Sequence, residues 1–90
     1  MTALKRTVRI DNKRGLHARA SAKFVTLAAT LPAEIQVEKD GNKVCGTSIM
    51  GLMMLGAAKG DDVTLHVSGD GAAEALEQLA SLIEGRFGED

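Results

Sequence analysis

The spacing of apolar residues switches between a period of two and a period of three to four along this chain, and this limits the folds that it can adopt. Strict alternation is typical of a half-buried strand, whereas steps of three and four are typical of an amphipathic helix. Alternation predicts four strands, over residues 4–10 (with an irregularity at Arg6), 34–38, 43–46 and 62–68. Lys39-Asp40-Gly41-Asn42 predicts a hairpin turn between the second and third strands, because glycine accepts the positive φ that such turns require.

Three helices are expected, after the first strand, between the third and fourth strands, and after the fourth. The first begins near His17 and is stopped by Pro32, and the second spans residues 49–55, with Ser48 as its N-cap and Gly56 as its stop. The apolar positions of the first and last helices are Ala20, Phe24, Leu27, Ala28 and Leu31, and Leu76, Leu79, Ala80, Ile83 and Phe87. The order β-α-β-β-α-β-α predicts an α+β fold, a four-stranded, mostly antiparallel sheet with the three helices on one face.

The length of the chain predicts a single domain, residues 1–90. Cys45 is the only cysteine, so it forms no internal disulfide and offers no metal-ligand spacing, and we expect neither a metal nor another cofactor. Residues 1–10 are basic and contain no apolar run, unlike a signal peptide. The longest weakly polar stretch, residues 47–58, is shorter than the roughly 20 residues that a membrane-spanning helix needs. We therefore expect a soluble, cytoplasmic protein.

The charges of the chain are distributed unevenly, although the formal net charge is only −1. Residues 61–90 contain eight of the twelve acidic residues and, in Arg86, one of the eleven basic residues. One pole of the folded chain should therefore be basic and the other acidic. Such an asymmetry suits docking onto a charged partner surface.

The main candidate site lies in residues 12–21. There is no acidic residue in residues 12–33, although helix starts usually attract Asp and Glu because their free N–H groups carry partial positive charge. We expect an anion site that contains His17, with Arg14 and Arg19 available to share the charge of a tetrahedral oxyanion. A neutral imidazole is also a nucleophile near pH 7. The residues alone leave open whether His17 binds an anion, becomes phosphorylated, or simply caps the helix at the surface.

Ser48 is a second candidate. Its first expected role is to cap the short helix that follows it. Capping does not exclude modification, because a phosphate at a helix start is electrostatically favourable. The sequence alone gives this second role little support.

The short second helix can bury only one stripe, which we expect to contain Leu52 and Leu55. The other large apolar side chains of this helix should then lie near the surface: Ile49, Met50, Met53 and Met54. Filling of the core is the commoner explanation for methionines. An exposed Met-rich patch beside a functional site would instead be an adaptable surface for a partner.

Other kinds of site find no support in the sequence. His66 is expected on the outer face of the sheet, without a partner. Gly56-Ala57-Ala58-Lys59 lacks the Gly-Lys-Ser/Thr ending of a phosphate-binding loop. The chain has no Trp or Tyr on which bases could stack, which argues against binding of RNA or single-stranded DNA.

Two sequence motifs, which lie within the predicted β-α-β-β-α-β-α order of elements, resemble those of the HPr family. This family comprises the histidine-containing phosphocarriers of the bacterial phosphoenolpyruvate-dependent phosphotransferase system. Gly15-Leu16-His17-Ala18-Arg19 is similar to the active-site signature of that family. Thr47-Ser48-Ile49-Met50-Gly51-Leu52-Met53-Met54-Leu55-Gly56 is similar to its regulatory-serine segment. The resemblance runs over nearly the whole chain, and the family fold, an open-faced β-sandwich, agrees with the predicted order of elements.

The resemblance implies that His17 accepts a phosphoryl group on Nδ1 from enzyme I and passes it to an enzyme IIA domain, while Arg19 holds the phosphate oxygens. Ser48 would be the serine that an ATP-dependent HPr kinase/phosphorylase modifies. The surface that docks these partners would consist of Ile49, Met50 and Met53. Such a protein is a phosphoryl carrier and a substrate of other enzymes, and we expect a monomer that is not itself an enzyme.

Ala20 departs from the family pattern, which usually has proline after the signature arginine. Since alanine favours a helix and proline near a helix start mainly fixes the backbone, we expect the site to survive. The change leaves open whether the chain serves sugar uptake or a regulatory, nitrogen-related phosphorelay. Two hypotheses of other classes also stay open: a regulatory binding module that docks through the methionines, and a small anion-binding domain.

Overall fold

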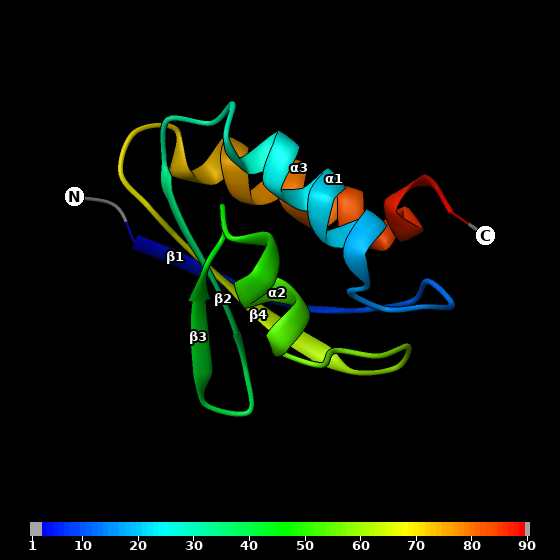
Figure 1. Ribbon diagram of the computed structural model, residues 1–90. Coiled ribbons are helices and arrows are strands. Elements are labelled where there is room, and N and C mark those ends of the chain that lie inside the picture. Colours follow the sequence, from blue (N-terminus) through cyan, green and yellow to red (C-terminus); the bar gives the residue numbers. More distant parts are fainter. Residues whose placement is uncertain (1–2, 90) are drawn as a thin grey trace.

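The computed structural model describes residues 3–89 and contains one sheet of four antiparallel strands (Figure 1). The spatial order of the strands is β1-β4-β2-β3, so the fourth strand lies between the first and the second. The bounds of the strands are Ala3–Arg9 for β1, Glu34–Lys39 for β2, Asn42–Cys45 for β3 and Asp62–Ser68 for β4. All four predicted strands are therefore present, and the fourth has the predicted bounds.

The β2–β3 hairpin closes through the predicted turn. Lys39 pairs with Asn42, which leaves Asp40 and Gly41 as the two residues of the turn. Their φ angles are +52° and +83°. Tight hairpin turns of this kind need positive φ at both central residues, and Asp and Gly are among the residues that accept it most readily.

The three predicted helices cover one face of the sheet and leave the other face open (Figure 1). Their bounds are Ala18–Ala28 for α1, Ile49–Met54 for α2 and Ala72–Glu84 for α3. A short 3₁₀ turn, η1 (Arg86–Gly88), follows α3. The α+β fold with an antiparallel sheet and helices on one face is confirmed.

The first and last helices are shorter than the sequence predicts. Helix α1 ends at Ala28, although apolar spacing continues to Leu31, because the residue before Pro32 is biased against helical dihedrals. Thr30 instead turns the chain, and its Oγ1 donates a hydrogen bond to the carbonyl of Leu27 at 2.7 Å. Phe87, predicted to lie on the last helix, is separated from α3 by a kink and has a φ of +54°.

The core lies between the sheet and the helices. The inward side chains of β4 are fully buried, and Phe24 from α1 and Leu79 from α3 pack with them. The irregular position in β1, Arg6, also faces the helices. Its guanidinium lies 3.3 Å from a carboxylate oxygen of Glu77 and 3.3 Å from one of Glu84, at the exposed edge of α3. An arginine is tolerated at this inward-facing position because its guanidinium extends past the buried side chains to the acidic residues at the edge of α3.

The prediction for His66, on the outer face of the sheet, was partly wrong. His66 lies on that face as predicted, but it has a partner: its Nε2 lies 2.6 Å from Oε1 of Glu38. In the register of β2 and β4, His66 is opposite Gln36, so Glu38 is its diagonal neighbour on the same face. The prediction of an isolated histidine was wrong because strand register cannot be read from either segment alone.

Candidate functional site

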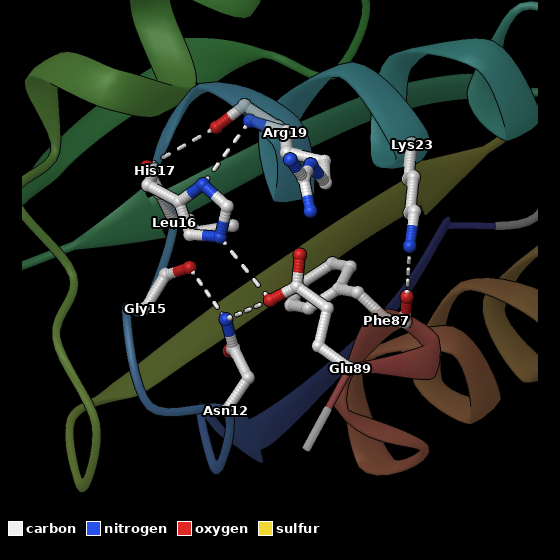
Figure 2. A network of polar contacts seen from close by, with 9 residues as sticks. Asn12, Gly15, Leu16, His17, Arg19, Lys23, Phe87 and Glu89 are labelled. Atoms are coloured by element: carbon white, nitrogen blue, oxygen red, sulfur yellow. Dashed lines mark hydrogen bonds and ion pairs between the residues drawn. The ribbon is translucent and has the colours of Figure 1, made fainter.

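His17 is the N-cap of α1, at the position that the sequence predicts. Its φ and ψ are −76° and −177°, which is extended backbone just before the first helical residue, Ala18. The ring nitrogen Nδ1 accepts a hydrogen bond from the backbone N–H of Arg19 at 3.1 Å (Figure 2). One free N–H group of the helix start is thereby satisfied by the imidazole. Ala20, which stands in the place of the family's proline, is buried in the same first turn.

The two residues before His17 are held against the loop that joins α2 to β4. Gly15 has a φ of +62°, and a Cβ atom at this position would collide with the carbonyl oxygen of Ala57. The backbone N–H of Leu16 donates to the same oxygen at 2.9 Å. The hydroxyl of Ser21, a buried residue, donates to the carbonyl of Leu16 at 3.2 Å. The backbone that presents the imidazole is thus fixed on both sides.

Asn12 is a fully buried polar residue below the imidazole. Its Nδ2 donates to the carbonyl of Gly15 at 2.8 Å and to Oε1 of Glu89 at 3.3 Å (Figure 2). The carbonyl of Asn12 also accepts from the N–H of Gly15 at 3.2 Å. The two hydrogen bonds between Asn12 and Gly15 shape the tight turn before His17. The bond between Asn12 and Glu89 joins this turn to a residue far along the chain.

Glu89 is the residue of this site that the sequence analysis missed. Its Oε1 lies 3.1 Å from Nε2 of His17, and its side chain is only 17% exposed. The hydrogen bond with His17 is the main reason why the pKa of Glu89 lies below its ordinary value. Burial opposes this lowering of the pKa, whereas the bond from Asn12 and the positive charge of Lys23 add to it.

No local signal in the sequence could have found this contact. Glu89 is 72 residues away from His17 and belongs to no motif with it. One indirect signal existed, because the acid-free start of α1 predicts that an anion is received there. The chain supplies such an anion itself, in the carboxylate of Glu89.

Basic side chains complete the predicted anion site. A shallow pocket of about 260 Å³ is lined by Lys13, Arg14, His17, Arg19 and Glu89. Within residues 3–89, neither Arg14 nor Arg19 forms an ion pair with a carboxylate, so both guanidinium groups are available to another anion. The structure therefore brings together His17, Arg14 and Arg19, as the sequence predicts. It adds Lys13 and Glu89 to them.

Ser48 caps α2, as predicted. Its Oγ accepts a hydrogen bond from the backbone N–H of Gly51 at 3.0 Å. Leu52 and Leu55 are buried beneath the helix, which also agrees with the prediction.

The other large apolar side chains of α2 lie at the surface, also as predicted. Their exposed fractions are 40% for Ile49, 69% for Met50, 40% for Met53 and 80% for Met54. We refer to these four residues as the Met-rich patch. Helix α2 contacts α1, so the patch lies on the element next to the helix that His17 caps. Met54, which the family resemblance leaves out of the docking surface, is the most exposed member of the patch.

Two kinds of feature were not found among the described residues. Over the range 3–89, no three His, Cys, Asp or Glu side chains form a group that could hold a metal ion. None of the helices in that range is both long enough and apolar enough to span a bilayer.

Comparison with known proteins points to one family. The family described as "PTS HPr component phosphorylation site" matches residues 4–85. The chain is 51% identical to Phosphocarrier protein HPr of Neisseria meningitidis over 86 residues, which cover 96% of this chain and 97% of that one. It is 40% identical to Phosphocarrier protein NPr of Shewanella violacea over 89 residues, or 99% and 98% of the two chains. The crystal structure of HPr from Thermoanaerobacter tengcongensis superposes with a TM-score of 0.90 at 47% identity, covering 100% and 99%.

Proposed function

Because this chain belongs to the HPr family of phosphocarrier proteins, we propose that it accepts a phosphoryl group on Nδ1 of His17 from phosphorylated enzyme I and passes it to an enzyme IIA domain. One observation carries this proposal. Nδ1 faces the backbone N–H of Arg19 in the first turn of α1, beside a pocket lined by Arg14 and Arg19. A phosphoryl group bound there would meet backbone donors and two positive charges. The protein would work as a monomer in the cytoplasm, as a substrate and donor for its partners.

The chemistry follows from the lone pair on Nδ1. This pair attacks phosphorus, a bond between Nδ1 and phosphorus forms, and the bond between phosphorus and the donor atom breaks with its electrons staying on the donor. Nδ1 must first give up its hydrogen bond from the N–H of Arg19. That N–H is then free to donate to a phosphoryl oxygen, while the guanidinium of Arg19 stabilises the charge on the others. Transfer to enzyme IIA reverses these steps.

The Met-rich patch is the proposed docking surface for enzyme I and enzyme IIA. Ile49, Met50 and Met53 are the members that the family motif identifies, and Met54 extends the exposed surface. Methionine side chains are flexible and polarizable, so one patch can adapt to two differently shaped partners. The basic side chains around His17 add attraction to an acidic partner surface.

Ser48 is proposed as a regulatory site for an HPr kinase/phosphorylase. The support is the match of residues 47–56 to the regulatory segment of the family. A phosphate on Ser48 would add negative charge beside the docking surface and slow phosphorylation of His17 through like-charge repulsion. Incubation with ATP and the kinase, followed by mass spectrometry, tests this proposal, and phosphate found on another residue would contradict it.

The primary test of the carrier function uses phosphoenolpyruvate and enzyme I. The wild-type chain should acquire an acid-labile phosphate, and His17→Ala should acquire none. His66→Ala is the matched control, because it removes the other histidine of the chain and should leave the labelling unchanged. Labelling of the His17→Ala protein would show that the proposed acceptor is wrong.

A regulatory, nitrogen-related phosphorelay is the second candidate function. It is favoured by the 40% identity to Phosphocarrier protein NPr over almost the whole chain. The two functions differ in the acceptor rather than in the site. The phosphorylated chain should therefore be offered a sugar-type and a nitrogen-type IIA domain in parallel, and the faster transfer identifies the branch.

A further inference from the structure

Both ring nitrogens of His17 are engaged, by groups from different parts of the chain. Nδ1 accepts the backbone N–H of Arg19, so it must carry a lone pair and no proton. Nε2 lies 3.1 Å from Oε1 of Glu89, and an ionised carboxylate can only accept, so Nε2 must carry the proton. Two independent contacts thus select the same tautomer of the neutral ring (Figure 2).

We propose that Glu89 is a positioning residue, which holds the proton of His17 on Nε2 and so directs the nucleophilic lone pair to Nδ1. This inference rests on the proposed carrier function. In the transfer step, a bond between Nδ1 and phosphorus forms and the bond from phosphorus to the donor breaks, while the proton stays on Nε2. The ring thereby becomes a positively charged phosphoimidazolium. The carboxylate at Nε2 stabilises that charge, as carboxylates do behind other functional histidines.

The fold holds Glu89 in this place through several contacts. Phe87 is buried although its φ is +54°, a value that few non-glycine residues adopt. Nζ of Lys23 donates to the carbonyl of Phe87 at 2.7 Å, which ties η1 to α1 (Figure 2). Asn12 then binds the carboxylate of Glu89 itself. A backbone conformation that is rare for non-glycine residues is retained only where surrounding contacts stabilise it. Here the contacts of Phe87, Lys23 and Asn12 place the carboxylate of Glu89 beside the imidazole of His17.

A competing explanation is that Glu89 merely occupies the anion pocket until a phosphoryl group displaces it. Its Oε1 is shared between His17 and Asn12, and its Oε2 is buried and makes no hydrogen bond within the described residues. Neither oxygen therefore binds Arg14 or Arg19, as a phosphate mimic would. The two explanations also predict opposite effects of removing the carboxylate, because a positioning residue speeds the transfer and an occupant slows it.

The first experiment needs no partner protein. The wild-type protein is labelled with ¹⁵N and measured at a pH at which the imidazole of His17 is neutral. The ¹⁵N chemical shifts of the two ring nitrogens should then show that the proton is on Nε2. The Nε2 proton should also resonate downfield and exchange slowly with water. Glu89→Gln, which keeps an acceptor but no charge, should reduce the downfield shift, and Glu89→Ala should abolish it. A proton on Nδ1 in the wild type, or an unchanged Nε2 proton in Glu89→Ala, would overturn the proposal.

The second experiment measures phosphorylation of the same proteins by phosphorylated enzyme I. Glu89→Ala should lower kcat about tenfold, the size expected for loss of a charge-assisted hydrogen bond, with little change in KM. Glu89→Gln should fall between this variant and wild type. Asp70→Asn is the matched control, since it removes an equal charge from an exposed turn just before α3, whereas Glu89 follows the end of that helix, and it should change nothing. A Glu89→Ala protein that reacts as fast as wild type, or faster, would contradict the positioning role.

The two experiments distinguish a failure of the proposed carrier function from a failure of the positioning role of Glu89. If the wild-type chain takes no label from enzyme I, the proposed carrier function is wrong. The nitrogen shifts would still decide whether Glu89 positions the ring of His17. Thermal unfolding of each variant, followed by circular dichroism, verifies that the compared proteins are folded.

Discussion

His17 and Ser48 are the N-caps of neighbouring helices. Each side chain accepts a backbone N–H of its own helix, from Arg19 at 3.1 Å and from Gly51 at 3.0 Å. Neither α1 nor α2 has an acidic residue in its first turn. Both helix starts therefore have an extended cap residue and a side-chain acceptor, although His17 binds the N–H two residues on and Ser48 the N–H three residues on.

Their surroundings differ completely. The cap of α1 lies among basic side chains and has a carboxylate from the far end of the sequence on its second nitrogen. The helix that Ser48 caps presents exposed methionines and an isoleucine instead. The chemistry that a capping side chain can perform therefore depends on the charged groups that surround it. The basic pocket at the start of α1 is suited to hold an anion, whereas the exposed side chains of α2 are suited to contact an apolar surface.

Removing positive charge at the first helix start should have the largest effect. Arg19→Met should slow phosphorylation by enzyme I by roughly 10- to 100-fold, because it removes a charge-assisted hydrogen bond to the transferring group. Arg14→Met should have a smaller effect, since Arg14 lines the same pocket but lies outside the signature that contains His17. Rates of label incorporation measure both. Equal losses in the two variants would mean that only the total charge of the pocket matters.

Two glycines with nearly equal φ, one beside each helix, allow a matched test of backbone positioning. Gly15 (φ +62°) faces the carbonyl of Ala57, whereas Gly56 (φ +65°) has open space around it. Gly56→Ala should lower the free energy of unfolding by about 1 kcal/mol, the usual cost of left-handed dihedrals for alanine. Gly15→Ala should cost about 1–3 kcal/mol more, because the backbone must also move. Urea denaturation measures both, and similar losses would show that the contact with Ala57 is unimportant.

A charge placed in the Met-rich patch should weaken docking and leave the chemistry of His17 intact. Met53→Asp should raise the KM for enzyme I about tenfold, since it puts a charge into an apolar contact. Ala73→Asp, on the exposed surface of α3, adds the same charge elsewhere and should have no effect on the KM. A fall in kcat at unchanged KM would assign Met53 to the reaction rather than to docking.

The smallest expected effect is the pH dependence of the stability that Glu89 contributes. The pKa of Glu89 is lowered from 4.5 in the folded chain, mainly by its hydrogen bond with His17. A group with a lowered pKa stabilises the folded state above its unfolded pKa, and this contribution is lost as the pH falls through the folded value. Wild type should therefore unfold at higher urea than Glu89→Gln at pH 6, and the difference should shrink steadily as the pH is lowered below 4.5 and through the pKa of Glu89 in the folded chain. A difference that does not change as the pH is lowered would mean that the charge is not its source.

Some of this site could be predicted because its causes are local. The caps at His17 and Ser48 follow from which side chain precedes a periodic apolar run, and the β2–β3 turn follows from Asp40 and Gly41. The exposure of the Met-rich patch follows from the limited width of a short helix. In each case the residues that decide the structure lie within a few positions of one another.

The order of elements, the face on which the helices lie and the cationic start of α1 were thus determined by the sequence itself. Only the tertiary structure decided that Glu89 contacts His17, that Asn12 joins them, and that Glu38 pairs with His66. These partners are 72, 77 and 28 residues apart in the chain. Such contacts depend on strand register and on how α3 and η1 pack against α1. Hydrophobic periodicity shows which side of an element is buried, but it carries no information about which distant polar group that side will meet.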